Sequence, residues 1–219
     1  MTEAQIRVVV ADDHAAIRAG MRLMLEQAPD ITVVGEAADG AVAVRQATAL
    51  RPDVVLMDIR MPGTDGISAT RAITSARLAD VLILTTFDFD DYLFGALRAG
   101  AAGFLLKSVE PAALIDAVRR VAAGDGFLAP EVTRRLLTAF VSTGPTPAPP
   151  PAPASFDSLT ERERDVLAAL GRGLSNAGLA AALAISEATA KTHVSRVLAK
   201  LGCTSRVQAA ILAREAGLA

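Results

Sequence analysis

The fold of this chain is decided first by the stretch Ile6-Arg-Val-Val-Val-Ala-Asp-Asp13. Its apolar and β-branched residues are typical of a short strand, and two acidic residues follow directly. A run that is apolar at nearly every position needs cover on both faces, as the strands of a parallel sheet have. The sequence therefore predicts a buried parallel strand with two carboxylates at its carboxyl end.

Four more runs of this kind follow, and helical patterns separate them. The expected strands span residues 6–11, 32–36, 54–57, 81–85 and 103–106. The expected helices span residues 15–27, 41–50, 66–75, 90–99 and 111–123. Five strands that alternate with five helices predict a doubly wound α/β domain built on a five-stranded parallel sheet.

A proline-rich stretch, residues 142–155, divides the chain. It holds most of the chain's prolines but no charged and no large apolar residue. Such a run cannot pack a core and favours extended polyproline geometry, so a linker is a better interpretation than a ligand for a proline-binding domain. We therefore expect an α/β domain over 1–128, a helical extension and the linker over 129–155, and a second domain over 156–219.

The second domain has a purely helical pattern. Thr160 and Glu163 have the spacing of a capping box at the start of a helix. Residues 174–184 are expected to form the next helix, and Ser186 and Ser205 to begin the two helices that follow it. Four helices in so short a segment predict a compact all-α domain.

The composition is that of a globular protein. Hydrophobic residues make up 52% of the chain, but no apolar run is long enough to cross a bilayer, and we expect no secretory signal. A single cysteine, Cys203, excludes an internal disulfide and a zinc cluster, and His14 and His193 lie far apart with no partner at ligand spacing. We expect a cytoplasmic protein with no membrane association.

The charge differs between the two parts of the chain. Residues 1–141 carry 14 Lys and Arg against 18 Asp and Glu, whereas residues 156–219 carry 8 against 6. An acidic first part and a mildly basic second part indicate different partners for the two.

Polar side chains follow the expected strands where those strands end. They are Asp12 and Asp13, Asp58, Thr85 and Lys107. Taken singly, each is explained as a helix cap or a surface residue. Because the carboxyl ends of parallel strands share one crevice, we expect all five to lie together. Clustered carboxylates need a cation, and a set of hard oxygen ligands fits Mg²⁺.

Such a site suits phosphoryl transfer. A carboxylate beside Mg²⁺ can attack a phosphoryl group, and Asp58 is the candidate nucleophile. The ammonium of Lys107 and the hydroxyl of Thr85 can take the remaining phosphoryl oxygens. The expected product is an aspartyl phosphate on Asp58.

The stretch 186–201 has the pattern of a recognition helix. Its apolar stripe comprises Ala190, Val194, Val197, Leu198 and Leu201. The other side carries Thr189, Thr192 and Arg196, with His193 and Ser195 on its flanks and Lys191 nearer the stripe. A small, polar and positive face suits the major groove of DNA, although charge alone favours a solvated helix face.

The first domain resembles two-component receiver domains over residues 6–128. The motifs are Val8-Val-Val-Ala-Asp-Asp-His14, Met57-Asp-Ile-Arg-Met-Pro-Gly63, Leu84-Thr-Thr-Phe-Asp88 and the run from Ala96 to Lys107. The resemblance implies the strand order 2-1-3-4-5, and phosphorylation of Asp58 from the phosphohistidine of a sensor histidine kinase. It also implies Mg²⁺ held by Asp12, Asp13, Asp58 and the backbone carbonyl of Arg60, and a switch formed by Thr85 and Phe104 together with Lys107.

The second domain resembles the LuxR-type helix-turn-helix over about residues 157–218. The motifs are the run from Leu159 to Leu167, Gly173-Leu-Ser-Asn176, Lys191-Thr-His-Val-Ser-Arg196, Lys200-Leu-Gly202 and Arg206-Val-Gln208. The pair of domains is similar to the NarL/FixJ class of response regulators, which are not turnover enzymes. It implies that phosphorylation controls sequence-specific binding to double-stranded DNA, and hence transcription.

This second resemblance extends the set of expected site residues. Lys200 joins the DNA-contacting residues, and Val207, Ala210 and Ile211 are expected to form a homodimer when the protein is phosphorylated or bound to DNA. Two positions depart from the family pattern, Gly178 in place of Glu and Ala190 in place of Val. Both lower the expected stability of this domain, and Ala190→Val is expected to raise its melting temperature.

Two other functions compete with this interpretation. A phosphatase that forms an aspartyl intermediate also uses an Asp nucleophile, but it needs a second Asp two residues later, where this chain has Arg60. A constitutive DNA-binding protein with a degenerate receiver needs no phosphorylation site, and the intact set of Asp13, Asp58, Thr85 and Lys107 argues against it.

Overall fold

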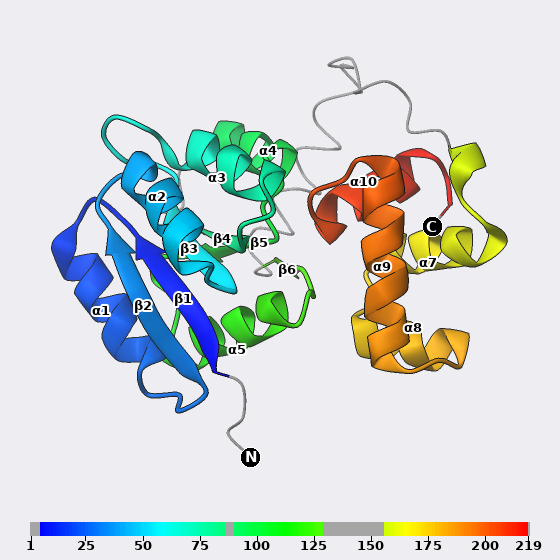
Figure 1. The fold of residues 1–219 in the computed structure, drawn as a ribbon, viewed down its shortest axis with the longest axis horizontal. Helices are drawn as coiled ribbons and strands as arrows, with labels where there is room; N and C mark the ends of the chain where they lie inside the picture. The colour runs from blue at the N-terminus through cyan, green and yellow to red at the C-terminus, as the bar shows by residue number, and fades with distance from the viewer. Residues whose placement is uncertain (1–4, 86–89, 129–155, 219) are drawn as a thin grey trace.

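Two domains lie side by side in the computed structural model, which describes residues 5–85, 90–128 and 156–218 (Figure 1). The first is an α/β domain and the second is helical, as the sequence predicts. The expected helical extension and linker, residues 129–155, lie outside the described residues. No described helix is long and apolar enough to cross a membrane.

The first domain is built on one parallel sheet. Its strands are β1 (Ile6–Ala11), β2 (Ile31–Ala37), β3 (Val54–Asp58), β4 (Asp80–Thr85), β5 (Gly103–Leu106) and β6 (Phe127–Leu128). They are arranged in the order β2-β1-β3-β4-β5-β6, so the expected five-stranded order is confirmed. The sixth strand was not predicted, because two residues carry no periodic signal. It pairs with β5 through Gly103 and Phe127.

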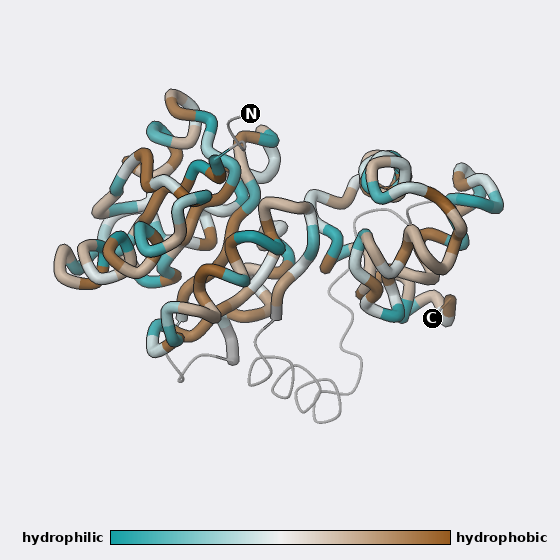
Figure 2. The backbone as a smooth tube through the Cα atoms, turned by 90° about the horizontal axis from the view of Figure 1, so that it is seen from below, coloured by the Kyte–Doolittle hydropathy of each residue, from teal (hydrophilic) through white to brown (hydrophobic). Residues whose placement is uncertain are grey.

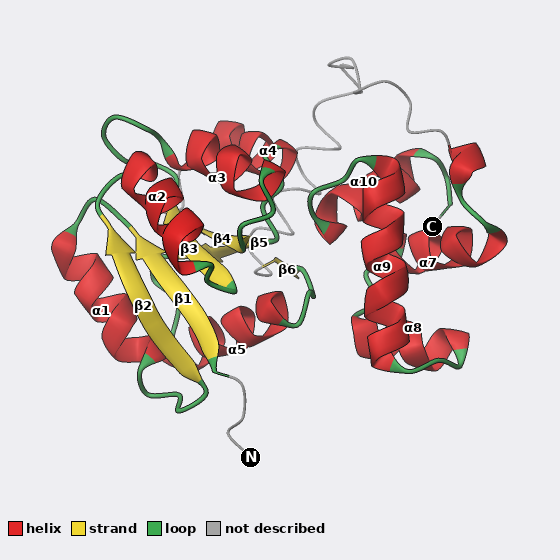
Figure 3. Cartoon of the chain, viewed as in Figure 1, coloured by secondary structure: helices red, strands yellow, loops and turns green. Residues whose placement is uncertain are grey.

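Helices cover both faces of this sheet (Figure 3). They are α1 (Ala15–Leu25), α2 (Gly40–Leu50), α3 (Gly66–Ser75), α4 (Asp90–Arg98) and α5 (Pro111–Ala122), and each predicted boundary lies within two residues of the observed one. Side chains alternate along the strands, so Val8, Val10 and Leu56 pack with α1 and α5. Val9, Val55 and Met57 pack on the other face with α2, α3 and α4.

The second domain contains four α-helices preceded by a single 3₁₀ turn, η1 (Phe156–Ser158). The helices are α7 (Glu161–Gly171), α8 (Asn176–Leu183), α9 (Glu187–Leu201) and α10 (Arg206–Glu215). The capping box of Thr160 and Glu163 is confirmed, with both reciprocal hydrogen bonds present. Helix α8 is shorter than expected because Ser175 caps its start and Ala184 ends it in the left-handed conformation.

Apolar and polar residues alternate along the backbone of both domains (Figure 2). The second domain buries its own core, which includes Leu167, Leu170, Leu179, Val197 and Ala209. The apolar stripe expected on α9 is confirmed at Ala190, Val194, Val197 and Leu201, which are all buried. Each domain therefore has a separate core, and the contacts between the domains are an additional interface.

Candidate functional site

Three charged side chains meet at the carboxyl edge of the sheet in the first domain. Asp12 follows β1, Asp58 is the last residue of β3 and Lys107 follows β5. The Nζ atom of Lys107 lies 2.7 Å from Oδ2 of Asp12 and 2.8 Å from Oδ2 of Asp58. Both carboxylates are buried. These distances bring together three of the five residues that were expected to meet at this edge.

The electrostatics of this cluster are set by burial and by one shared cation. Burial raises the pKa of Asp58, and the hydrogen bond and charge of Lys107 act in the opposite direction without cancelling it. Burial disfavours the charged form of Lys107, but its hydrogen bonds to Asp12 and Asp58 outweigh this and raise its pKa. One ammonium is therefore shared by two buried carboxylates, which leaves a net negative charge.

The donor atoms of this edge fit a hard divalent cation. Oδ2 of Asp12 is buried, and the ammonium of Lys107 lies 2.7 Å from it. Oxygen atoms of Asp12 and Asp13 lie, with a ring nitrogen of His14, within 4.8 Å of one another. The acidic cluster is therefore consistent with a metal site.

His14 was expected to have no partner at ligand spacing, and the structure corrects this. Its Nδ1 lies 2.7 Å from Oδ1 of the partly exposed Asp13. The signal was present, because His14 follows Asp13 directly in the sequence.

The expected switch residues lie along β4 and β5. Thr85 is half-buried at the end of β4 and pairs with Leu106, whereas Phe104 is fully buried on β5. Phe104 belongs to the same apolar cluster as Leu93, Ala96 and Leu97 of α4. Arg60 is exposed, and its backbone N–H donates a hydrogen bond to Asp58. A change at Asp58 thus has a packed route to α4.

Most of the expected DNA-contacting residues lie on the open side of α9. Thr189, Lys191, Thr192, Ser195 and Arg196 are exposed, and His193 is half-buried. The structure gives Lys200 a different environment. Its Nζ lies 2.6 Å from Oε2 of the buried Glu163 and 3.0 Å from the carbonyl of Ser158, so its charge is paired inside the domain.

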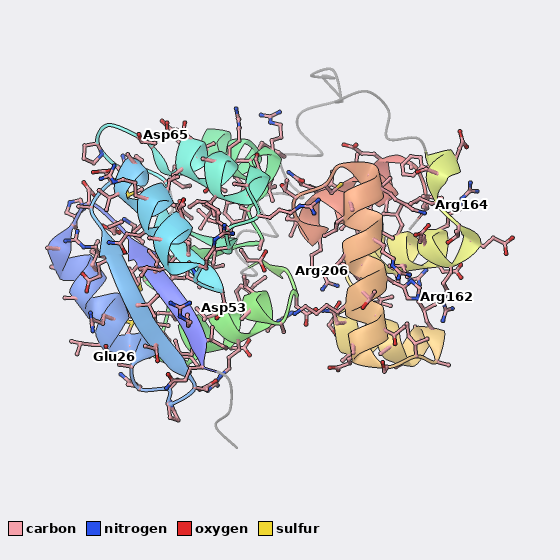
Figure 4. The ribbon with its side chains drawn as sticks, viewed as in Figure 1. Glu26, Asp53, Asp65, Arg162, Arg164 and Arg206 are labelled. Atoms are coloured by element: carbon pink, nitrogen blue, oxygen red, sulfur yellow. The ribbon has the colours of Figure 1, made fainter. Side chains whose placement is uncertain are left out.

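Polar residues of the second domain bind the amino edge of the first domain's sheet. The guanidinium of Arg206 donates to Oδ1 of Asp125 over 2.5 Å and to the carbonyl of Gly124 over 2.7 Å. Arg206 lies on the side of its domain that faces the first domain (Figure 4). Gln208 donates through Nε2 to the carbonyls of Leu97 and Arg98 at the end of α4, over 3.0 and 3.1 Å.

The stripe expected to form a dimer is used in this interface. Val207 and Ile211 pack against the apolar cluster of the first domain, and Ala210 is half-buried. Thr204 lies directly against Gly100, which has a φ of +93°. Any side chain at Gly100 would collide with Thr204, so this close approach requires glycine. Sequence reasoning placed none of these contacts between the domains.

A receiver-like sheet with a buried aspartate cluster, joined to a helix-turn-helix domain, defines a response regulator that binds DNA. Residues 8–119 match the family model for the response regulator receiver domain, and residues 157–213 match that for bacterial regulatory proteins of the luxR family. The chain belongs to the family of two-component response regulators with a LuxR-type DNA-binding domain, which are transcriptional regulators and not turnover enzymes.

Similar proteins match over nearly their whole length. The transcriptional regulatory protein LiaR of Bacillus subtilis (strain 168) is 39% identical over 95% of this chain and 96% of its own. The nitrate/nitrite response regulator NarL of Escherichia coli (strain K12) is 35% identical over 93% of each chain. The crystal structure of the response regulator ChrA of a heme-sensing two-component system is 42% identical, with a TM-score of 0.56, over 99% of this chain and 100% of that one.

Proposed function

We propose that Asp58 is the phosphorylation site and that a sensor histidine kinase is the phosphoryl donor. The observation that supports this best is the bridge from Lys107 to Asp12 and Asp58, because it places a cation beside a buried carboxylate at a strand end. An oxygen of Asp58 forms the new bond to phosphorus as the bond between phosphorus and the kinase histidine breaks. The histidine keeps the electron pair of that bond and takes a proton.

Each remaining residue of the cluster has a role in this step. Lys107 neutralises charge on the phosphoryl oxygens, and the hydroxyl of Thr85 turns toward them. Asp12, Asp13, Asp58 and the backbone carbonyl of Arg60 would hold Mg²⁺, which when bound supplies further positive charge for those oxygens. Phe104 then fills the space that Thr85 leaves, and α4 repacks against it.

We further propose that phosphorylation releases the second domain from the first. In the docked arrangement Lys191 and Ser195 line the cavity between the domains, and Val207 and Ile211 are covered. Release removes the receiver from beside Lys191 and Ser195, so that double-stranded DNA can reach the whole surface formed by Thr189, Lys191, Thr192, His193, Ser195 and Arg196. It also frees Val207, Ala210 and Ile211 for a homodimer. We place the domains at 1–128 and 156–219 of a cytoplasmic protein.

Acetyl phosphate with Mg²⁺ tests the proposed site without knowledge of the kinase. The full chain is expected to gain one phosphate at Asp58 that is stable in acid and labile in base, and its affinity for DNA is expected to rise. The matched variant Asp58→Asn should gain neither, because the amide that replaces the carboxylate is not a nucleophile. Phosphorylation at another residue, or an equal rise in DNA affinity in Asp58→Asn, would contradict the assignment.

A further inference from the structure

We propose that the start of α8 and the guanidinium of Arg206 form a binding site for one phosphate of the DNA backbone. The carboxylate of Asp125 occupies this site when the domains are docked. The proposal rests on the DNA binding of the family and does not depend on phosphorylation of Asp58.

A single carboxylate oxygen is held by both elements of the site. Oδ1 of Asp125 accepts the backbone N–H of Asn176 over 2.9 Å and Nη1 of Arg206 over 2.5 Å. Asn176 is the first residue of α8, so its N–H has no partner within the helix. Ser175 caps this helix through the N–H of Gly178, which leaves the N–H of Asn176 free for an external anion. The site is therefore already shown to take an anionic oxygen.

Arg206 supplies the positive charge at this position. Its side chain is 10% exposed, and within its own domain it is held by neutral acceptors, the carbonyl of Leu174 and Oδ1 of Asn176. Among the described residues, Asp125 is the one carboxylate that pairs with it. When the domains separate, this guanidinium loses the carboxylate that pairs with it, and its position beside the N–H of Asn176 is open to another anion.

The position of this site matches the geometry of a helix-turn-helix on DNA. A cavity of about 160 Å³ lies between the domains, and Asn176 and Arg206 line it together with Lys191 and Ser195 of the recognition helix. The scaffold helix of such a domain crosses the DNA backbone while the recognition helix lies in the major groove. Phosphates bind readily at helix N-termini. The residue that faces Lys191 across the cavity is Asp80, a second carboxylate.

A phosphodiester fits these donors better than the carboxylate of Asp125, which accepts both hydrogen bonds with a single oxygen. Its two free oxygens can divide the bonds, one accepting from the N–H of Asn176 and the other from the guanidinium of Arg206. Contacts of this kind carry no sequence information, so they position the domain on any duplex.

Two substitutions at one position isolate the backbone donor. Asn176→Ala removes the side chain and keeps the N–H, whereas Asn176→Pro removes both. Proline is compatible with the first position of a helix, and Ser175 before it has a ψ of 171°, which a following proline allows. Both variants are made in the full chain that carries Asp125→Ala, so that docking does not mask the site.

Affinity for a fluorescent duplex of arbitrary sequence is measured at low salt by anisotropy. The Pro variant is expected to bind about tenfold more weakly than the Ala variant, because it loses one charge-assisted hydrogen bond to the phosphate. Circular dichroism checks that both retain the same helix content. Equal affinities of the two variants would overturn the proposal. If every chain, including Asp125→Ala alone, failed to bind DNA, the DNA binding itself would be contradicted and the site with it.

The salt dependence of binding tests the guanidinium separately. Replacement of Arg206 by Gln in the Asp125→Ala chain removes one cation, and the slope of log K against log salt is expected to fall by about 0.9. An unchanged slope in a folded Arg206→Gln variant would show that this cation meets no phosphate, and would also overturn the proposal.

Discussion

The two edges of the receiver sheet both carry buried or half-buried acids, but their cations have different origins. At the carboxyl edge, Asp12 and Asp58 share Lys107, which belongs to the same domain. At the amino edge, Asp125 pairs with Arg206 of the DNA-binding domain. The first balance of charge is fixed by the fold, whereas the second exists only while the domains are docked. The amino edge can therefore respond to domain movement, and the carboxyl edge to chemistry.

Helix α4 connects the two edges. It begins just beyond the segment that follows Thr85, and its last residues accept hydrogen bonds from Gln208. Ala99, directly after the helix, accepts a hydrogen bond from the buried Thr74 over 2.7 Å, which anchors that end to α3. A shift of α4 caused at Asp58 therefore reaches the contact that holds the DNA-binding domain.

The largest effect is expected from Lys107→Met, which removes the cation at the carboxyl edge and leaves the contacts at the amino edge unchanged. Two buried carboxylates lose their cation, and the pKa of Asp58, already raised by burial, rises further. DNA affinity without a phosphoryl donor should equal that of the wild type, but acetyl phosphate should no longer raise it. Anisotropy with a labelled duplex measures both states. A rise as large as in the wild type would show that Lys107 is dispensable for the response.

Substitution of Gln208 weakens only the contact at the amino edge. Gln208→Glu keeps the oxygen that accepts from the N–H of Thr204 but loses the two N–H bonds to α4. At about 0.5–1.5 kcal/mol for each of the two bonds, unphosphorylated protein should bind DNA more tightly by about five- to 150-fold. Gln208→Ala is the control that also removes the bond to Thr204. If Gln208→Glu binds DNA no better than the wild type, α4 does not hold the docked domain through this residue.

A carboxylate inside the DNA-binding domain sharpens the contrast with Asp58. The hydrogen bond from Lys200 and those from Thr160 lower the pKa of Glu163 to about 2 from 4.5. Because folding lowers this pKa, the ionised carboxylate stabilises the fold at pH values above the pKa of Glu163 in the unfolded chain. This stabilisation is lost as the pH falls through about 2. Glu163→Gln should therefore melt lower than the wild type at neutral pH, with a difference that shrinks in acid. A difference that stays constant down to about pH 2 would mean that the charge of Glu163 contributes nothing.

The smallest effect is expected from Gly178→Ala, which separates domain stability from domain docking. A methyl group at this position meets Leu174 and Ser175 at ordinary contact distance. The helical backbone loses less entropy with alanine, so the DNA-binding domain should gain up to ~1 kcal/mol. DNA affinity should not change, because the described atoms nearest to the new methyl group, those of Leu174 and Ser175, belong to the DNA-binding domain itself. A stabilised variant with altered affinity would indicate that docking depends on the stability of this domain.

Much of the fold and of the carboxyl edge was predictable from the sequence, for a physical reason. Buried parallel strands are marked by their own residues, and their carboxyl ends must meet at one edge, so Asp12, Asp58 and Lys107 could be placed together. The recognition helix was predictable in the same way, because its buried stripe follows the helical period.

The amino edge could not be predicted, because its residues are far apart in the sequence and each is an ordinary surface residue by itself. Asp125 and Asn176 carry no pattern that joins them. The stripe of Val207 and Ile211 was expected to face a second copy in a homodimer, whereas in the docked arrangement the receiver covers it. The resemblance placed Lys200 among the DNA-contacting residues, but no pattern in the sequence joins it to its partner Glu163.

Amide hydrogen exchange at Asn176 in the full chain tests the central claim most directly, because this N–H is bonded to Asp125 across the domain boundary. Exchange is compared before and after treatment with acetyl phosphate and Mg²⁺, with Asp58→Asn as the control. The N–H of Gly178, bonded to Ser175 within the domain, serves as an internal reference. We predict faster exchange at Asn176 in the phosphorylated wild type, no change in Asp58→Asn and no change at Gly178. Unchanged exchange at Asn176 in protein fully phosphorylated on Asp58 would contradict release of the DNA-binding domain.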